Sequence, residues 1–388
     1  MKKLLCVTGS RAEYGIMRRL LLELNKDPNI CLSIVATGMH CDPKFGSTYK
    51  NIEEDGFTID KMIPIDIDTS TNSKVLNSMS ICQSGFGEYL EFNKFDAILI
   101  LGDRYEIFSV AIAAAIHNIP LIHLHGGEKT LGNYDEFIRH AITKMSKLHL
   151  ASTEEYRQRI IQMGEEPSSV YNIGALGAEN AAILDLPNTT QLEKKFGSFV
   201  KPYFMVVFHP ETLTNVSLES QVKEVLAAIS EYMPEYDFVF IGSNSDTGSD
   251  KITELVSKYC HDNNLRYMTS VSSEEYLALN KYSCGLIGNS SSGLIEIPTL
   301  GVATVNIGDR QKGRVRGNSV FDTPCDKNSI IEAIESSLKL ESSNINNPYY
   351  QKGVLDEALV RISEFLNSKL ITLPKDFFDI NSNATEGL

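Results

Sequence analysis

One turn of the chain reads Cys284-Gly285-Leu286-Ile287-Gly288-Asn289-Ser290-Ser291-Ser292-Gly293, an apolar run followed by small residues. An apolar, helix-like stretch follows, from Leu294 to Leu300. Small residues at a strand-to-helix turn expose backbone N–H groups and hydroxyls at a helix N-terminus, which attracts anions, phosphates above all. The stretch therefore predicts a strand that feeds a helix, with either an anion site or an ordinary helix cap at the junction.

The same alternation of short apolar runs and amphipathic segments fills the first half of the chain. The predicted strands are Leu4–Thr8, Cys31–Thr37, Ala97–Leu101, Pro120–Leu124, Leu148–Ala151 and Val170–Ile173. The predicted helices include Arg11–Lys26, Lys74–Phe92, Tyr105–His117, Tyr134–Lys144 and Glu154–Met163. Strands that are apolar throughout and separated by helices indicate a parallel sheet covered on both faces.

After a polar stretch, Asp185–Ser198, the pattern begins again. The predicted strands are Tyr203–Phe208, Phe238–Ile241, Leu265–Met268, Cys284–Ile287 and Val302–Asn306, and the helices are Leu218–Tyr232, Asp250–Cys260 and Ser273–Lys281. We predict an α/β protein with two doubly wound, Rossmann-like domains, 1–184 and 199–345, that face a central cleft. A final helix, about 349–368, is expected to cross back onto the first domain, and the tail from Asn381 is expected to fray.

Composition narrows the class of protein. At 388 residues the chain exceeds the ~250–300 at which one core stops growing. No apolar run reaches the ~18–20 residues of a membrane span, and the N-terminal apolar stretch is too short for a secretion signal. Seven scattered cysteines without a C-x-x-C pair suggest reduced thiols and a cytoplasmic protein. A net charge of -14 argues against nucleic acid and membrane surfaces as partners.

A local basic cluster interrupts this acidic chain. Arg310, Lys312, Arg314 and Arg316 lie close together, shortly after the Ser290–Ser292 turn. We interpret the turn and the cluster as half of a diphosphate pocket. The alternative is a helix cap followed by a solvated loop.

Polar residues that directly follow apolar strands are the candidates for chemistry, because ligands in such sheets bind beyond the carboxyl ends of the strands. Five such segments are present, namely Gly9–Gly15, Gly102–Glu106, His123–Glu128, His209–Glu211 and Asn289–Ser292. Arg11 and Arg104 each open a helix, where a cation opposes the helix dipole. This placement favours contact with a ligand phosphate over a surface ion pair.

Three of these segments carry candidate proton-transfer or hydrogen-bonding groups. Asp103 emerges from a buried strand, so it is either a proton-transfer group with a raised pKa or a helix N-cap. His123 and His125, two apart on a strand, point to one face and precede Glu128, which would suit zinc. The companion metal motifs are missing, so we predict no metal, and the alternative for His123 is a core histidine whose hydrogen bonds are satisfied. His209 suits a donor to a phosphate or leaving-group oxygen.

The next helix contains Asp135, Glu136, Arg139 and His140. Asp135 and Arg139 are four residues apart, which predicts an ordinary helix ion pair. Absent motifs also matter. The chain has no G-x-G-x-x-G, no Walker A sequence, and no lysine four residues after any of its sixteen tyrosines. These absences disfavour short-chain nicotinamide-dependent epimerases and P-loop kinases.

The motifs, in this order, resemble the UDP-N-acetylglucosamine 2-epimerase family, and most closely its hydrolysing branch, which feeds bacterial sialic acid capsule synthesis. The similarity covers nearly the whole chain and is most specific in Gly9–Gly15, Gly102–Phe108, His123–Thr130, Tyr134–Ser146 and Gly288–Gly317. The resemblance implies a glycosyltransferase-B-like architecture and a cytoplasmic homodimer. It also implies conversion of UDP-N-acetylglucosamine and water to N-acetylmannosamine and UDP, with no cofactor and no metal.

In that family the reaction begins by elimination: a base removes the C2 proton of the sugar while UDP departs, and water then adds to the resulting glycal. By motif match, the resemblance assigns the diphosphate to Arg11, Arg104, His209, Ser290 and Ser291, the ribose to Glu296, and the same nucleotide wall to Arg310. It assigns acid/base chemistry to Asp103, the sugar side to Asp135 and Glu136, and further substrate binding to Glu13, His123 and Asn244.

One position departs from the family pattern. Many relatives carry glutamate where this chain has His125, so the resemblance leaves the base open among His125, Glu128 and Asp135. Three alternatives to the hydrolysing epimerase also remain at this point. They are a 2-epimerase of a UDP-2,4-diacetamido-6-deoxy sugar, a glycosyltransferase on the same scaffold, and a non-enzymatic nucleotide-sugar binding module.

Overall fold

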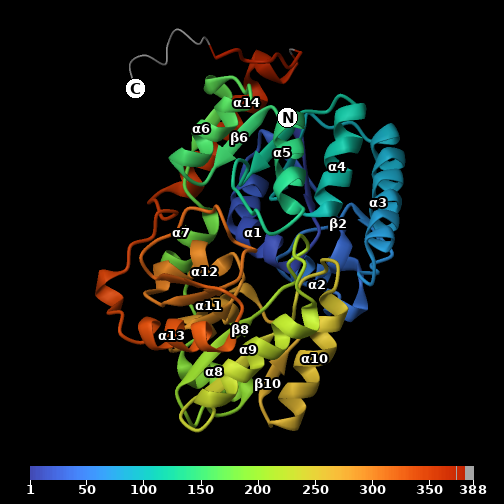
Figure 1. The fold of residues 1–388 in the computed structure, drawn as a ribbon. Coiled ribbons are helices and arrows are strands. Elements are labelled where there is room, and N and C mark those ends of the chain that lie inside the picture. The colour runs from blue at the N-terminus through green and yellow to red at the C-terminus, as the bar shows by residue number, and fades with distance from the viewer. Residues whose placement is uncertain (373, 381–388) are drawn as a thin grey trace.

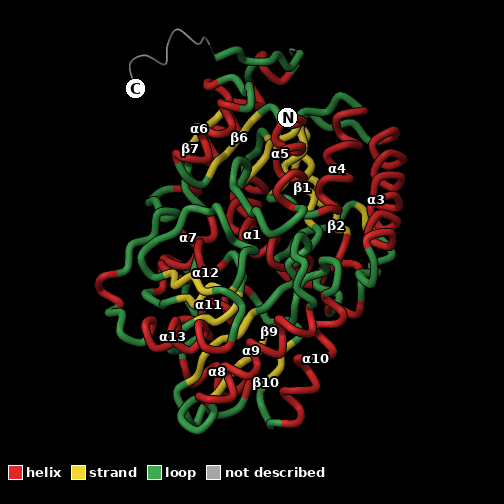
Figure 2. Tube along the Cα trace, viewed as in Figure 1, coloured by secondary structure: helices red, strands yellow, loops and turns green. Residues whose placement is uncertain are grey.

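The computed structural model describes residues 1–372 and 374–380, and it contains a parallel sheet in each half of the chain (Figure 2). Within the described residues the first sheet has seven strands in the order β3-β2-β1-β4-β5-β6-β7. They are β1 Lys2–Thr8, β2 Ile30–Thr37, β3 Lys61–Ile63, β4 Ala97–Leu101, β5 Leu121–Leu124, β6 Leu148–Ala151 and β7 Val170–Asn172.

Helices cover both faces of this sheet, which is why its central strands are apolar throughout. They are α1 Arg11–Lys26, α2 Tyr49–Glu54, α3 Asn72–Phe92, α4 Tyr105–Ile116, α5 Asp135–Met145, α6 Glu154–Gln162 and α7 Leu176–Ile183. Short 3-10 turns are η1 Gly38–Cys41, η2 Pro43–Phe45 and η3 Pro167–Ser169. Ile98 and Ile100 of β4 pack under α3, α4 and α5, whereas Leu99 and Leu101 face the core beneath α1.

The second sheet, within residues 203–323, has the order β10-β9-β8-β11-β12-β13 and is also parallel. Its strands are β8 Tyr203–Val207, β9 Asp237–Ile241, β10 Arg266–Met268, β11 Leu286–Gly288, β12 Thr304–Ile307 and β13 Val320–Thr323. Its helices are α8 Thr189–Phe196, α9 Leu218–Tyr232, α10 Ser249–Asp262, α11 Ser273–Lys281, α12 Ser292–Ile295 and α13 Lys327–Ser337, with η4 Ile297–Leu300 and η5 Ser342–Asn344. The fold is thus two doubly wound α/β domains.

The C-terminal helix α14, Val354–Asn367, returns to the first domain and is followed by η6 Lys369–Ile371. Figure 1 shows it in red beside α6 and β6, far from the orange elements that precede it in the sequence. Ala358, Ile362 and Phe365 of this helix share the core beneath α1. The domain boundaries at 184, 199 and 345 remain predictions.

Several observed elements were absent from the sequence-based prediction, namely α2, α7, α13, β3 and β13. The two strands are short, partly exposed and at sheet edges, so the continuous apolar signal that marks the inner strands is missing. The helix-like stretch expected from Leu294 to Leu300 is the end of one α-helical turn followed by η4, because Pro298 cannot donate the hydrogen bond that would continue the helix. The tail from Asn381 lies outside the described residues.

Loops from the two domains meet at the carboxyl ends of both sheets. The Tyr134 N–H donates to the Thr212 hydroxyl over 2.9 Å, and the Thr212 N–H donates to Asn133 Oδ1 over 3.0 Å. The Gly248 N–H donates to the Thr69 carbonyl over 2.8 Å. These hydrogen bonds hold the cleft between the domains closed. No helix among the described residues is long and apolar enough to cross a membrane.

Candidate active site

The interdomain cleft gathers most of the predicted site residues. Arg11 and Asp103 lie just beyond β1 and β4, and His209, Asn244 and Ser290 just beyond β8, β9 and β11. Because all these strands are parallel, their carboxyl ends share one edge of each sheet, and the two edges face each other. The site is therefore built from both domains.

Arg11 carries an unpaired hydrogen-bond donor into this cleft. Its Nη1 is buried and has no hydrogen-bond partner in the described part of the chain. Burial lowers the pKa of Arg11 to about 10, so the side chain is still a cation at neutral pH. A cavity of about 490 Å³ between the domains is lined by Arg11, Tyr14 and the start of α11. A bound anion would satisfy this donor.

Arg104 is held by two carboxylates and by the second domain. Its Nε lies 2.6 Å from Glu106 Oε1 and 3.4 Å from Glu13 Oε1, and its Nη2 donates to the Ser245 hydroxyl. Burial and the neighbouring Glu106 raise the pKa of Glu13 to about 7, although Arg104 opposes this shift. Glu13 therefore lies behind Arg104, where it orients the guanidinium.

The hydrogen bonds of His209 define the tautomer of its neutral ring, and so which ring nitrogen is a donor. The Asn244 N–H donates to its Nδ1 over 3.2 Å, so in the neutral ring the proton belongs to Nε2. Burial, and then Arg310 and Arg104, hold the pKa of His209 well below its ordinary value, which keeps the ring neutral. The Asn244 side chain itself donates to Asp246, so the part of Asn244 that touches the site is its backbone.

Asn289 follows β11, at the start of the Ser290–Ser292 turn, and it contacts residues that follow β8 and β12. Its Oδ1 accepts the His209 N–H at 2.7 Å, and its carbonyl accepts from Arg310 Nη1 at 3.2 Å. The hydroxyls of Ser290 and Ser292 are 3.1 Å apart, and Ser291 begins the single turn of α12. Arg310 and the serine turn thus lie together, next to His209.

The rest of the basic cluster points elsewhere, which corrects the interpretation of all four cations as one diphosphate wall. Lys312 pairs with exposed Asp309 at 3.2 Å, and Arg316 pairs with Asp322. Arg314 reaches across the cleft to Glu128 Oε2 at 2.6 Å. The four cations of this loop point toward different partners, so their closeness in sequence does not bring their charges together.

Asp103 is paired with Arg139, which is fully buried. Arg139 also donates to the Glu128 carbonyl at 3.0 Å and to the Thr130 hydroxyl at 3.2 Å. The expected helix ion pair between Asp135 and Arg139 is not the contact that forms. The helix turns Arg139 toward the end of β4 instead, because a buried guanidinium needs the charge of Asp103.

The two histidines at the end of β5 have different surroundings. His123 is fully buried, its Nε2 lies 2.8 Å from the Gly102 carbonyl, and burial lowers its pKa to about 3. It supports the backbone before Asp103 and does not reach the cleft surface, contrary to its predicted substrate contact. His125 follows the strand with a φ of 63°, and its Nδ1 lies 3.0 Å from Glu128 Oε1. Among the described residues, no group of three or more His, Cys, Asp or Glu could hold a metal ion.

Asp135 and Asp246 bring two buried carboxyls from opposite domains to one place. Burial, and then the charge of Asp246, raise the pKa of Asp135 to about 7, while Arg310 opposes the shift. Asn133 Nδ2 donates to Asp135 Oδ2 over 3.1 Å. A carboxyl whose pKa lies near neutrality can both take up and release a proton during turnover.

Asp135→Asn is expected to stabilise the protein at pH 8 and to have little effect at pH 4. The folded pKa of Asp135 is raised, so the folded state keeps a proton that the unfolded state loses above pH ~4. The carboxyl therefore lowers the free energy of unfolding increasingly as the pH rises from ~4 toward 7, and the full loss remains above that pH. Urea unfolding at the two pH values should show a gain of more than about 1 kcal/mol at pH 8 and little at pH 4. An equal effect at both would contradict the raised pKa.

Glu136 and Glu296 occupy opposite walls of the site. Glu136 accepts the Thr130 N–H and lies 3.3 Å from His140 Nε2, and these contacts outweigh burial and lower its pKa. Burial raises the pKa of Glu296 to about 7. A Cβ at Gly177 would collide with the Glu296 carboxylate, so this glycine makes room for it.

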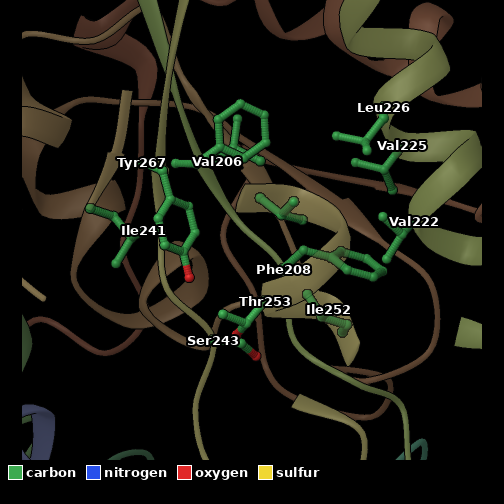
Figure 3. A pocket seen from close by; sticks show the side chains of 12 residues that line it. Val206, Phe208, Val222, Val225, Leu226, Ile241, Ser243, Ile252, Thr253 and Tyr267 are labelled. Atoms are coloured by element: carbon green, nitrogen blue, oxygen red, sulfur yellow. The ribbon is translucent and has the colours of Figure 1, made fainter. Parts of the chain in front are cut away.

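A separate apolar pocket lies inside the second domain (Figure 3). Val206, Phe208, Val222 and Ile252 line it, and its volume of about 10 Å³ has room for no more than a water molecule. It belongs to the core around β8 and β9.

Sequence reasoning missed Asp246 and the cross-domain role of Arg314. Asp246 is 3% exposed and lies 3.4 Å from Arg310 Nη2. It follows Asn244 closely in the loop after β9, so a consistent search of residues beyond every strand would have found it. The partner of Arg314 has no comparable signal, because Glu128 lies in the other domain.

The fold and the site together define a two-domain α/β protein whose cleft between the domains carries buried cationic and hydrogen-bond-donating groups. Its architecture is that of the solved UDP-N-acetylglucosamine 2-epimerases, which is glycosyltransferase-B-like. The structure of the Methanocaldococcus jannaschii UDP-GlcNAc 2-epimerase in complex with UDP-GlcNAc and UDP matches with a TM-score of 0.76, at 19% identity. The match covers 94% of this chain and 99% of that one.

The family model described as UDP-N-acetylglucosamine 2-epimerase matches residues 22–366, and the chain belongs to this family. It is 58% identical, over 99% of both chains, to the Polysialic acid biosynthesis protein P7 of Escherichia coli. It is also 38% identical, over 88% of both chains, to the GDP/UDP-N,N'-diacetylbacillosamine 2-epimerase (hydrolyzing) of Campylobacter jejuni. The chain is therefore an enzyme of the UDP-N-acetylglucosamine 2-epimerase family.

Proposed function

We propose that this enzyme is a hydrolysing UDP-N-acetylglucosamine 2-epimerase, which converts UDP-N-acetylglucosamine and water to N-acetylmannosamine and UDP. The observation that carries the proposal is the pairing, in one closed cleft, of anion-seeking groups with proton-transfer groups. Arg11, His209 and Arg310 supply the former, and Asp103 and His125 supply the latter. An elimination needs both, since the leaving diphosphate must be stabilised while a weakly acidic C2 proton is removed.

The contacts support the following roles. Neutral His209 donates from Nε2 to the leaving diphosphate, and Arg11 and Arg310 balance its charge. A base takes the C2 proton as the bond between C1 and the UDP oxygen breaks, which leaves a C1–C2 double bond. Water then adds its hydroxyl at C1, and a proton returns to C2 on the opposite face. Asp135, with its pKa of about 7, suits that second proton transfer.

The relative from Escherichia coli supports a place in polysialic acid synthesis, since N-acetylmannosamine is the amino sugar that the hydrolysing branch provides. The homodimer and the cytoplasmic location that the resemblance implies stay predictions. The relative from Campylobacter jejuni favours a second candidate, hydrolysis and epimerisation of a UDP-2,4-diacetamido-6-deoxy sugar.

Parallel incubation with the two nucleotide sugars, followed by phosphorus and proton NMR, tests the proposal. We expect release of UDP and free N-acetylmannosamine from UDP-N-acetylglucosamine, at least tenfold faster than from the diacetamido sugar. Accumulation of UDP-N-acetylmannosamine would instead show a non-hydrolysing enzyme. Preference for the diacetamido sugar would establish the second candidate.

A further inference from the structure

The turn after β5 folds a histidine and a glutamate back onto each other. His125 has a φ of 63°, which a residue with a side chain rarely adopts. Gly127 has a φ of 78°, and a Cβ there would lie 2.6 Å from the Tyr156 carbonyl. The glycines therefore let the chain reverse sharply, and Glu128 reaches His125 Nδ1 at 3.0 Å.

Glu128 is held as a carboxylate from both domains. Its Oε1 accepts from the Ser152 hydroxyl at 3.0 Å, and its Oε2 lies 2.6 Å from Arg314 Nη2. Burial alone would raise the pKa of Glu128, but Arg314 and the bond from His125 outweigh burial and lower it. Arg314 comes from the second domain, and its loop is fixed there because the Val315 N–H donates to the Tyr156 hydroxyl over 2.8 Å.

An ionised Glu128 can only accept a hydrogen bond, so the neutral His125 ring carries its proton on Nδ1. This leaves Nε2 as a bare acceptor. His125 is 8% exposed, and its Nε2 is buried with no hydrogen-bond partner among residues 1–372 and 374–380. A buried nitrogen that lacks a partner, on a ring whose tautomer is fixed by a carboxylate, is the arrangement of a histidine general base.

We propose that His125 Nε2 is the base that removes the C2 proton, and that Arg314 is a positioning residue that assembles this base when the domains close. The inference rests on the proposed function and selects one of the three bases left open by the sequence. In the step, the C2–H electron pair forms the C1–C2 double bond, UDP leaves with the C1–O pair, and the proton moves to Nε2. The resulting imidazolium is stabilised by Glu128.

Two further titratable groups face this ring. Glu296 lies on the second-domain side and His123 on β5. His123 stays neutral, as its lowered pKa requires. Arg314 is the neighbouring cation, and it pairs with the Glu128 oxygen that does not contact His125. Removal of Arg314 therefore takes away one of the contacts that hold Glu128 against His125.

The test compares Arg314→Met, Arg314→Lys and Lys44→Met in the full-length enzyme, with UDP-N-acetylglucosamine as substrate. Lys44 pairs with Asp250 across the domains but lies outside the site, so Lys44→Met controls for loss of a cross-domain ion pair. We expect Arg314→Met to lower kcat by about 10–100-fold, with KM within threefold of the wild-type value. Arg314→Lys should restore most of the wild-type kcat, and Lys44→Met should match the wild type.

A second variant tests the base directly. His125→Asn can still donate to Glu128 but lacks a nitrogen at Nε2, so kcat should fall by about 1,000-fold while UDP affinity is retained. Turnover near the wild-type rate in folded His125→Asn, or an unchanged kcat in Arg314→Met, would overturn the inference. If the wild-type enzyme turns over neither UDP-N-acetylglucosamine nor the diacetamido sugar, the proposed function is wrong, and the roles of His125 and Arg314 are not what failed.

Discussion

Asp103→Asn is expected to lower turnover of UDP-N-acetylglucosamine by about 100-fold or more while UDP binds within a few-fold of its normal affinity. The carboxyl stands at the end of β4, where fully buried Arg139 pairs with it and fixes its position. An amide keeps the shape but cannot exchange a proton. Initial rates, together with UDP titration by calorimetry, separate chemistry from binding.

The same substitution leaves Arg139 without a counter-ion, so folding must be checked beside activity. Breaking a buried ion pair costs about 3–5 kcal/mol, which urea unfolding would reveal. Asp103→Glu keeps the charge and moves the carboxylate by one methylene, so it should fold well and still lose most of its rate. Near-normal turnover in a folded Asp103→Asn enzyme would remove this residue from the mechanism.

Arg310→Met is expected to weaken UDP binding by about 100-fold and to lower kcat as well. Its guanidinium donates to the Asn289 carbonyl. It lies beside His209 and the Ser290–Ser292 turn, where the diphosphate is proposed to bind. Charge-assisted hydrogen bonds to a phosphate contribute about 1.5–3 kcal/mol in a buried site. Calorimetric titration with UDP measures the loss.

Lys312→Met is the matched control for Arg310→Met, because it removes a cation from the same loop. Lys312 is exposed and pairs with Asp309, so its loss should change UDP affinity less than threefold. Equal effects of the two substitutions would show that the loop acts through its overall charge. That result would contradict the separation of the basic cluster seen in the structure.

The sequence predicted the fold well, for a physical reason. Strands such as Ala97–Leu101 are buried on both faces, so they are apolar throughout, and this signal survives without any knowledge of the partner strands. Edge strand β13, Val320–Thr323, is covered less completely and carries no such signal. Helix α13 did carry a helix signal that the prediction overlooked, since Asp326 caps it and Ile330 and Ile334 are buried one turn apart.

The site was predictable where function depends on position relative to a strand end. Arg11, Asp103 and His209 all meet that condition. Contacts between distant parts of the chain were not predictable, because one sequence does not reveal which charges meet. Arg139 was expected to pair within its own helix and instead pairs with Asp103. Glu128 and Arg314 belong to different domains and meet only in the closed cleft.

The central claim is that UDP leaves as the hydrogen on the neighbouring sugar carbon is removed. Turnover of UDP-N-acetylglucosamine in deuterated water, followed by proton NMR of the products, tests it most directly. The account predicts free N-acetylmannosamine that carries deuterium at C2 in every molecule formed. N-acetylmannosamine that retains its original C2 hydrogen would contradict the account.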